Sequence, residues 1–404
     1  MKIFKRHLFN DIYRHISQEE TTIITGSRQV GKTTLLKNIK DNLERDGENA
    51  FYITLERVEV KKMLDKNPEN IFSIIPPPGS NKTFIFIDEI QYLDNPTNFL
   101  KLLYDEYRNK LKLVVTGSSA FYIDRKFKDS LAGRKRIFHL KPFSFKEVLE
   151  CRGEIEVAKY VQKGMNSQEK TPLIYQDKLF RIAEEYAIYG GYPRVVLAED
   201  YKEKQLVLYE LVNSFLKKDA LESSIRKESE FMLFVEVLAD RIGNKLNRQE
   251  LGNICNINDE TVLNYIYILQ KSFHISVVRP FWRSKTTELR KMPKFYFQDN
   301  GMRNAVLNNF TPVALRKDKG EIVENMAYNL LSEHFLPKQI KYWMTKEQKE
   351  VDFIIDDKFA LEIKYSDSLI KKSKYKLFTE TYPNIQFKFA CFEKTFNNLQ
   401  LWSV

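Results

Sequence analysis

The stretch that decides the fold of the first part of the chain is Thr22-Ile23-Ile24-Thr25, followed by Gly26-Ser27-Arg28-Gln29-Val30-Gly31-Lys32-Thr33. The second segment fits the phosphate-binding pattern G-x-x-x-x-G-K-[ST] at every position. It also lies in the required context, between a β-rich run and a helical stretch. Glycines let backbone N–H groups wrap around phosphates, and the helix N-terminus adds its positive dipole end. The predicted phosphate-binding residues are Gly26, Ser27, Arg28, Gln29, Val30, Gly31, Lys32, Thr33 and Thr34.

A second part of the same site is expected in Ile85-Phe86-Ile87-Asp88-Glu89, an apolar run that ends in two carboxylates. Lys32 should reach the β- and γ-phosphates, and Thr33 should ligate Mg²⁺. Asp88 is placed to hold Mg²⁺ directly or through water, and Glu89 to orient and polarise the attacking water. The alternative is a strand that simply ends in polar residues. The two segments together predict a Mg²⁺-dependent nucleoside triphosphate hydrolase.

The length and composition of the chain limit the number of domains and the class of protein. The 404 residues correspond to two to four domains at roughly 100–200 residues each, and a hydrophobic content of 43% excludes a wholly disordered chain. No apolar run approaches the roughly 20 residues that span a bilayer, and the N-terminus does not resemble a signal peptide. Three widely spaced cysteines argue against a disulfide framework or a zinc knuckle. We therefore expect a cytoplasmic protein without a membrane partner.

The net charge of +11 suggests an anionic partner. Residues 101–141 hold eleven Lys+Arg against four Asp+Glu, and the stretch from Arg279 to Lys294 holds six Lys+Arg against Glu288 alone. Taken singly, such runs are most often solvated faces.

The coarse pattern of secondary structure predicts an α/β protein. Apolar runs at Phe51–Leu55, Thr83–Ile87 and Leu111–Thr116 alternate with helical stretches, which is typical of a parallel sheet with helices on both sides. Residues 145–221 read as helical and polar, with a break at Gly190-Gly191-Tyr192-Pro193. Residues 229–282 give three helical stretches and then the strand Ile275–Val278, which matches a winged helix-turn-helix.

The nucleotide motifs resemble those of AAA+ ATPases, and more narrowly of a group of predicted archaeal and bacterial ATPases. Thr116-Gly117-Ser118-Ser119 is similar to the sensor-1 region, in which a polar side chain such as Ser118 monitors the γ-phosphate. Ala132-Gly133-Arg134, before Leu140-Lys141-Pro142-Phe143-Ser144-Phe145, is similar to the G-R and L-x-P-[FL]-S-F segments of that group. The resemblance implies ATP as the nucleotide. It makes Arg134 an arginine-finger candidate, against a structural or nucleic-acid-contacting role.

Gly191-Tyr192-Pro193-Arg194 resembles the G-x-P-R sensor-2 motif, in which the arginine contacts the phosphates from a helical lid. The resemblance therefore assigns Arg194 a nucleotide-contacting role. The alternative is that the Gly-Pro pair marks an ordinary helix start.

A second chemical signal lies near the C-terminal end, in Glu350-Val351-Asp352-Phe353-Ile354-Ile355 and Phe359-Ala360-Leu361-Glu362-Ile363-Lys364. Asp356-Asp357-Lys358 can turn the chain between them into a hairpin. The two-residue period of a strand puts Glu362 and Lys364 on one face and Asp352 away from its apolar neighbours. Two carboxylates bind a hard cation such as Mg²⁺, and the lysine can position or activate water.

This constellation resembles the PD-(D/E)xK nucleases, with Glu362-Ile363-Lys364 as E-x-K and Asp352 as the preceding acid. An α-β-β-β-α-β order supports the resemblance, which implies Mg²⁺ or Mn²⁺ as the metal and Glu324 on the upstream helix as a further ligand. The proline of the motif is replaced by Val351. The alternatives are a strand of solvated charges, or a degenerate domain that binds nucleic acid without cutting it.

Four domains are expected: a AAA+ core over 1–145, a helical lid over 146–222, a winged helix over 223–300 and a PD-(D/E)xK-like domain over 301–404. The first functional hypothesis is an ATPase that acts on DNA, with RNA left open. Its wing would contact phosphates through Arg279, Arg283, Lys285, Arg290, Lys291 and Lys294. The second is a nucleotide-dependent switch that engages a protein partner in signalling or defence, with an inactive nuclease-like domain. AAA+ resemblance also suggests a homo-oligomer.

Overall fold

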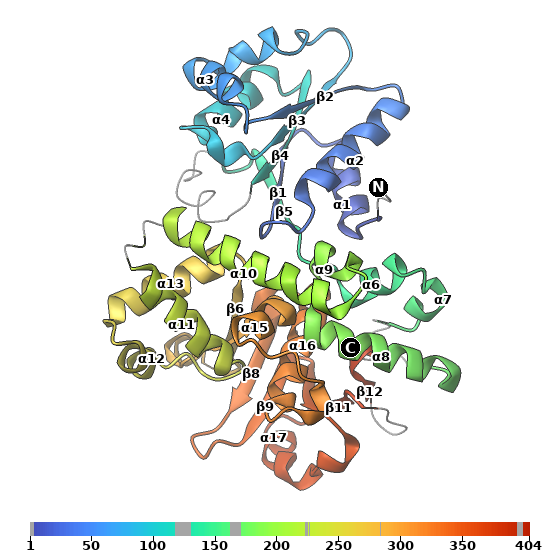
Figure 1. The fold of residues 1–404 in the computed structure, drawn as a ribbon, viewed down its shortest axis with the longest axis vertical. Coiled ribbons are helices and arrows are strands. Elements are labelled where there is room, and N and C mark those ends of the chain that lie inside the picture. Colours follow the sequence, from blue (N-terminus) through green and yellow to red (C-terminus); the bar gives the residue numbers. More distant parts are fainter. Residues whose placement is uncertain are drawn as a thin grey trace. The chain divides into compact units, whose positions relative to one another are not determined.

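The computed structural model describes residues 4–117, 131–161, 171–222, 225, 227–282, 284–393 and 399–404, with only the backbone described for 216–222. The chain divides into two compact units (Figure 1). Unit 1 comprises residues 1–141 and 271–273, and unit 2 comprises residues 142–270 and 274–404. Among the described residues, no helix combines the length and apolar character needed to span a bilayer.

Unit 1 contains a five-stranded sheet in the order β2-β3-β4-β1-β5, and every neighbouring pair is parallel. This confirms the predicted parallel sheet. The central strands are buried throughout, whereas β5 has mostly polar residues and partial exposure, which is why its sequence gave no strand signal. The strands are β1 (Thr21–Thr25), β2 (Asn49–Thr54), β3 (Thr83–Asp88), β4 (Leu111–Gly117) and β5 (Lys135–His139).

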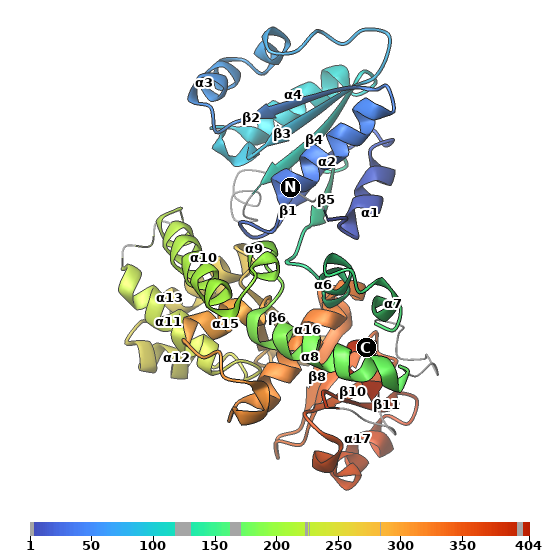
Figure 2. The same cartoon turned by 45° about the vertical axis from the view of Figure 1, so that its right-hand side comes forward.

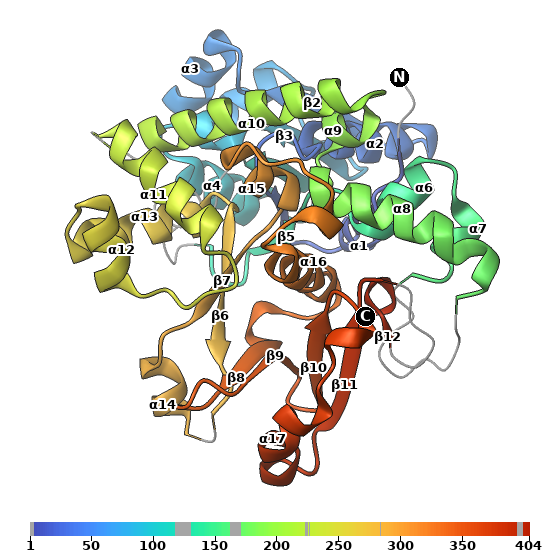
Figure 3. The same ribbon diagram turned by 60° about the horizontal axis from the view of Figure 1, so that its bottom comes forward.

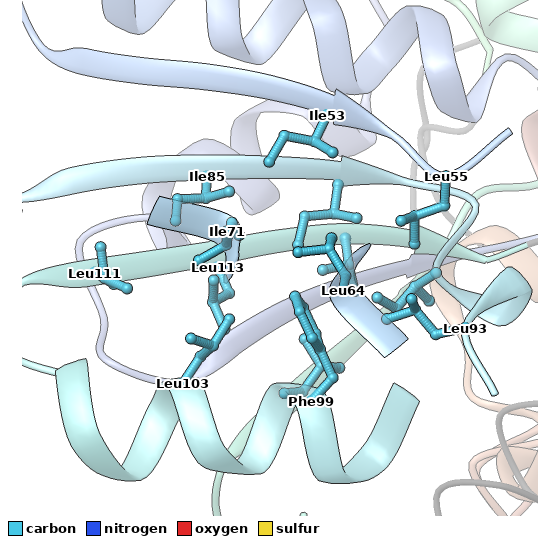
Figure 4. Close-up of a cluster of buried hydrophobic side chains, with 14 of the residues drawn as sticks. Ile53, Leu55, Leu64, Ile71, Ile85, Leu93, Phe99, Leu103, Leu111 and Leu113 are labelled. Atoms are coloured by element: carbon cyan, nitrogen blue, oxygen red, sulfur yellow. The ribbon is translucent and has the colours of Figure 1, made fainter. Parts of the chain in front are cut away.

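Helices cover both faces of this sheet, with α1 and α2 on one side and α4 on the other (Figure 2). Apolar side chains of β2, β3 and β4, including Ile53, Ile85 and Leu113, pack with Phe99 and Leu103 of α4 (Figure 4). The elements are α1 (Leu8–His15), α2 (Lys32–Arg45), α3 (Val58–Lys66), α4 (Pro96–Tyr107), and the 3₁₀ turns η1 (Pro68–Ser73) and η2 (Ile90–Tyr92).

Unit 2 begins with a helical region, as the polar helical pattern predicted. Ser144 starts its first helix with a capping box, since its side chain accepts the Glu147 N–H and the Glu147 carboxylate accepts the Ser144 N–H. The helices are α6 (Phe145–Cys151), α7 (Ile155–Ala158), α8 (Leu173–Tyr189), α9 (Pro193–Leu197), α10 (Tyr201–Glu222), α11 (Glu228–Asp240), α12 (Arg248–Cys255) and α13 (Asp259–Lys271).

A seven-stranded mixed sheet follows, in the order β12-β11-β10-β9-β8-β6-β7 (Figure 3). β6 pairs antiparallel with β7 and parallel with β8. The expected α/β unit is therefore distinct from the first sheet, and it includes the hairpin that precedes residue 300. The strands are β6 (Ile275–Pro280), β7 (Lys294–Phe297), β8 (Ile340–Met344), β9 (Glu350–Ile355), β10 (Phe359–Lys364), β11 (Gln386–Cys391) and β12 (Leu399–Gln400).

Between β10 and β11, the helix of the expected α-β-β-β-α-β order is instead two 3₁₀ turns and one short helix, because Ile370, which follows the first turn, adopts an extended conformation. α16 packs against β10, and Phe378 of α17 packs into an apolar cluster with Ile354 and Ala360. The remaining elements are α14 (Lys285–Arg290), α15 (Asn300–Val306), α16 (Lys319–His334), α17 (Lys376–Thr381), and the 3₁₀ turns η3 (Val313–Leu315), η4 (Pro337–Gln339), η5 (Asp367–Leu369), η6 (Lys372–Tyr375) and η7 (Leu401–Ser403).

Candidate active sites

The predicted phosphate loop connects β1 to α2 in unit 1, and two of its glycines are required by the backbone. Gly26 has a φ of +153°, and a Cβ at this position would lie 2.0 Å from the carbonyl oxygen of Leu140. Gly31 has a φ of +96° and caps the N-terminus of α2. Only glycine accommodates both the close approach and the left-handed geometry at low cost. The motif glycines are thus explained by local structure.

The Lys32 side chain is buried within this loop, at 5% exposure. Its ammonium donates to the carbonyl oxygens of Gly26 at 3.0 Å and Ser27 at 2.8 Å. Arg6 braces the same loop, because its guanidinium donates to the carbonyl oxygens of Val30 at 2.8 Å and Lys141 at 2.7 Å. No sequence pattern marked Arg6, which lies far from the motif along the chain.

Asp88 lies at the end of β3 and is 3% exposed. Its carboxylate accepts hydrogen bonds from the Thr33 hydroxyl at 2.8 Å, the Tyr52 hydroxyl at 3.0 Å and the Thr116 hydroxyl. Burial and the adjacent Asp88 carboxylate raise the pKa of Tyr52, which stays protonated as a donor. The structure therefore brings together Thr33 and Asp88, the two residues predicted to hold Mg²⁺. Tyr52 was missed, although it lies within the strand predicted at Phe51–Leu55, which the structure pairs with β3.

Glu89 has a left-handed backbone, with φ +59° and ψ +51°. This conformation is uncommon for a residue other than glycine and is frequent at functional sites. Its N–H donates to the Thr116 hydroxyl at 2.9 Å, and its carboxylate accepts from the Gln91 amide. Thr116 thus contacts both acids of the motif, because β3 and β4 are adjacent and parallel.

The three residues assigned by resemblance have different outcomes. Ser118 lies outside the described residues. Arg134 donates to Asp105 of α4 at 2.7 Å, within unit 1. Arg194 donates to Glu210 of α10 at 3.0 Å, within unit 2. The finger and sensor roles therefore stay predictions.

Both glycines of the Gly190-Gly191 segment lie in close contact with neighbouring parts of unit 2. The Gly191 N–H donates to the buried Asp299 carboxylate at 2.7 Å, and a Cβ on Gly191 would lie 2.1 Å from the Phe143 carbonyl oxygen. A Cβ on Gly190 would lie 2.1 Å from the Asp299 carboxylate. Burial raises the pKa of Asp299 to about 6 in spite of its backbone N–H donors. The Gly190-Gly191 segment therefore links the helical region to Asp299, the N-cap residue of α15.

The predicted carboxylates of unit 2 converge on a cavity of about 520 Å³. Asp352 and Glu362 are only 8% and 4% exposed, so the interpretation as a strand of solvated charges is wrong. The acids also bridge β9 and β10, because the Ile363 N–H donates to Asp352 at 2.7 Å and the Asp352 N–H to Glu362 at 3.3 Å. Glu324 of α16 lines the same cavity.

Lys364 forms an ion pair with Glu362 in this cavity. The Tyr375 hydroxyl donates to the same carboxylate at 2.7 Å. Burial opposes the charge on Lys364, but the Asp352 and Glu362 carboxylates outweigh it and raise the pKa of Lys364. Lys364 is therefore a cation held beside the two acids.

Two further residues of the site come from β7 and were not predicted there. The Lys294 ammonium lies 2.9 Å from a Glu324 oxygen and also forms an ion pair with Glu350. The Tyr296 hydroxyl donates to Glu324 at 2.6 Å. The expectation that Lys294 contacts nucleic-acid phosphates is therefore wrong, because its side chain is buried between carboxylates.

Burial and mutual repulsion raise the pKa values of the carboxylic acids Glu350, Asp352 and Glu362 in this cavity. Burial, followed by the charges of Glu362 and Glu324, raises the pKa of Asp352 well above its ordinary value. Burial also raises the pKa values of Glu350 and Glu362 against the pull of their lysines. Carboxylate oxygens of Glu324, Glu350 and Asp352 lie within 4.8 Å of one another. Such oxygens are of the kind that ligates a hard divalent cation, and the Lys294 ammonium already contacts two of these three carboxylates.

The other basic residues of the predicted wing are distributed differently. Arg279, Lys285 and Arg290 are exposed, whereas the Lys291 ammonium lies 3.3 Å from the centre of the Trp282 ring. Arg283 lies outside the described residues. Three helices followed by an antiparallel pair are the element order of a winged helix, and that assignment stays a prediction.

Three family models match consecutive parts of the chain. Residues 18–149 match a family described as an AAA domain. Residues 181–312 match a domain of unknown function (DUF8612), and residues 319–395 match another (DUF4143). Lys294 and Tyr296 thus fall in the second matched region, whereas the carboxylates fall in the third.

Among relatives that match most of the chain, an uncharacterized protein of Methanocaldococcus jannaschii is 25% identical over 365 residues, covering 88% of this chain and 77% of the relative. The chain is also 25% identical over 343 residues to an uncharacterized protein of Haemophilus influenzae, covering 82% and 78%.

Solved structures similar to part of the chain include the Thermotoga maritima RuvB Holliday junction branch migration motor. It is 14% identical with a TM-score of 0.35, over 68% of this chain and 89% of that one. AMPPCP-bound DnaA from Aquifex aeolicus is 14% identical with a TM-score of 0.30, over 65% and 86%. Scores this low do not establish a shared overall fold. The family matches and the geometry together show an AAA-family P-loop domain at residues 18–149, followed by two domains of unknown function.

Proposed function

We propose that unit 1 binds ATP with Mg²⁺ and hydrolyses it. The observation that carries this proposal is the buried Asp88 carboxylate, which the Thr33 hydroxyl contacts at 2.8 Å beside the phosphate loop. Thr33 and Asp88 would hold Mg²⁺, whose charge would offset that of the phosphates. Their hydrogen bond keeps both oxygens together for that purpose.

Lys32 and Glu89 would act on the substrate. The Lys32 ammonium would exchange the Gly26 and Ser27 carbonyls for phosphate oxygens, because these neutral partners compete weakly with an anion. Glu89 would orient the attacking water and accept its proton, with Gln91 and Thr116 fixing its position.

Two variants test this assignment. Lys32→Ala should lose ATP binding and hydrolysis, whereas Glu89→Gln should bind ATP normally and lose turnover by about 10²–10⁴-fold. Lys40→Ala is the matched control, because Lys40 lies on the same helix and pairs with Glu44 outside the loop. Normal hydrolysis in either site variant, measured as phosphate release, would overturn the assignment.

We further propose that unit 2 carries a metal-dependent phosphodiesterase site that acts on nucleic acid. Asp352 and Glu362 would hold one Mg²⁺ or Mn²⁺, which would polarise the scissile phosphate when bound. Lys364 would orient water or stabilise the developing negative charge. The supporting observation is that these three side chains line one cavity and are buried, although two of them come from a different strand than the third.

Cleavage of labelled DNA and RNA in Mg²⁺ or Mn²⁺ tests the second proposal. Asp352→Asn and Lys364→Met should abolish it, while Glu347→Gln, an exposed acid on the loop before β9, should not. Cleavage that persists in both site variants would come from elsewhere. If only one of the two nucleic acids is cut, that result identifies the substrate class as DNA or as RNA.

Exposed Arg279 and Arg290 support contact with a nucleic-acid backbone. Binding to duplex DNA should then weaken with salt, with a log–log slope of about −0.9 per neutralised phosphate. The competing hypothesis is a nucleotide-dependent switch for a protein partner. It gains support if DNA neither binds at low salt nor changes the ATPase rate.

A further inference from the structure

The Lys294 ammonium contacts Glu324 and Glu350, two of the three carboxylates that could together ligate a metal ion. We propose that Lys294 is a built-in cation of the unit 2 site, which binds Glu324 and Glu350 in place of a second divalent ion. The site then takes a single divalent cation at Asp352 and Glu362. This inference rests on the proposed metal site and adds to it the number of ions and the residue that sets it.

Lys294 is fixed in this position by burial and by its partners. Its side chain is 5% exposed, and its ammonium contacts carboxylates from α16 and β9. A buried charge is tolerated when it is paired, and removing one partner of such a pair leaves the other uncompensated. Tyr296, two residues along the same strand, donates to Glu324 and holds that carboxylate toward Lys294. Lys294 therefore belongs to the interior of the site.

The charge balance indicates one divalent ion. The groups that contact one another inside the cavity are six: the carboxylates of Glu324, Glu350, Asp352 and Glu362 and the ammonium groups of Lys294 and Lys364. Lys245, Lys317 and Glu321, which are exposed, and the half-exposed Lys319 also line the cavity, and solvent screens their charges. Four minus two leaves a formal charge of −2 when all six are ionised, which one divalent cation neutralises. Loss of the Lys294 charge would leave −3, which favours tighter binding or a second ion.

The geometry also places Lys294 among the carboxylates that a second ion would use. Oxygens of Glu324, Glu350 and Asp352 lie within 4.8 Å of one another and could ligate an ion. Lys294 contacts the first two of these residues. Paired metal ions in hydrolytic sites lie about 3.5–4 Å apart and share their carboxylates. An ammonium bound to two of the three acids excludes one member of such a pair.

Titration of Mn²⁺ into the nucleotide-free full-length chain, with free Mn²⁺ counted by electron paramagnetic resonance, tests the proposal. The wild type should bind one ion that Asp352→Asn removes. Lys294→Gln should bind that ion at least about tenfold more tightly, or take a second one, because a repelling charge is gone. Adding Glu350→Gln restores the −2 balance and should return binding to that of the wild type.

Lys349→Gln is the matched control, because it removes an exposed lysine next to Glu350 without touching the cluster. Wild-type stoichiometry and affinity in folded Lys294→Gln would overturn the proposal. If that variant folds only with Mn²⁺, the ion replaces the ammonium and the proposal stands; failure to fold even with Mn²⁺ would contradict it. A gain of Mn²⁺ binding with no nuclease activity in any variant would retain this inference and reject the proposed function.

Discussion

Replacing Asp352 by Asn should stabilise the metal-free protein at neutral and alkaline pH while removing its metal site. Burial and neighbouring acids raise the pKa of Asp352 above its ordinary value. The folded state therefore holds this proton at pH values where the unfolded chain has released it. Stability contributed by the protonated form is present at low pH and is lost as pH rises through the folded pKa. Asparagine carries no charge and avoids that loss.

The magnitude follows from opposing charges around Asp352. Two unit charges about 5 Å apart in a medium with an effective dielectric constant of about 20 interact by about 3 kcal/mol. Repulsion by Glu362 and Glu324 is then roughly offset by attraction to Lys364 and Lys294. The cost of burying the charge remains, and we expect Asp352→Asn to gain about 1–3 kcal/mol at pH 8. The amide oxygen of asparagine can still accept the Ile363 N–H.

Calorimetric unfolding in a chelator between pH 4 and pH 8.5 measures this effect. A non-hydrolysable ATP analogue should shift only the transition of unit 1 and so identify that of unit 2. The unit 2 transition of Asp352→Asn should rise by roughly 2–4 °C per kcal/mol at pH 8 and match the wild type near pH 4. Asp357→Asn, on an exposed turn, is the control. Equal or lower stability of Asp352→Asn at pH 8, or a gain independent of pH, would refute the reasoning.

Three further substitutions probe the same features. Gly26→Ala places a Cβ 2.0 Å from the Leu140 carbonyl oxygen, so a fluorescent ATP analogue should bind at least about tenfold more weakly; unchanged affinity would contradict the loop geometry. Gly191→Ala should lower the unit 2 transition by several degrees without changing nucleotide affinity, whereas a selective loss of affinity would favour a sensor role for this segment. Tyr375→Phe removes a donor that favours ionised Glu362, so the pKa of Glu362 should rise and Mn²⁺ binding should require a higher pH; an unshifted pH profile would count against this contact.

The nucleotide site was largely predictable because its motif constrains both residue types and context. The G-x-x-x-x-G-K-[ST] pattern fixes a strand, a loop and a helix, and the apolar run before Asp88 fixes a second strand. Parallel strands with these ends bring Thr33 and Asp88 together, as the 2.8 Å hydrogen bond confirms. The contacts of Arg6 and Tyr52 could not be predicted from the motif. Their contacts depend on which segments lie side by side, 24 or more residues apart along the chain.

The number of charged residues in a segment predicted the location of the Lys294 side chain less well than the two-residue period of a strand did. Lys294 was grouped with exposed arginines because the stretch from Arg279 is basic, but composition does not distinguish a solvated lysine from a buried one. The run Lys294-Phe295-Tyr296-Phe297 places Lys294 and Tyr296 on the same face of a strand. That alternation was a usable signal, and both side chains contact Glu324.

Sheet topology explains why the site is built from both sides of residue 300. β6 is paired with β7 on one edge and with β8 on the other, so the hairpin and the terminal strands share one sheet. The carboxylates lie in the region matched by one family of unknown function, and Lys294 lies in the region matched by the other. A fragment that begins after residue 300 would retain Glu324, Glu350, Asp352 and Glu362 but would lack the cation that two of these acids bind. The two matched regions therefore form one chemical unit, and the metal affinity of the isolated terminal fragment should differ from that of the full chain in the direction of Lys294→Gln.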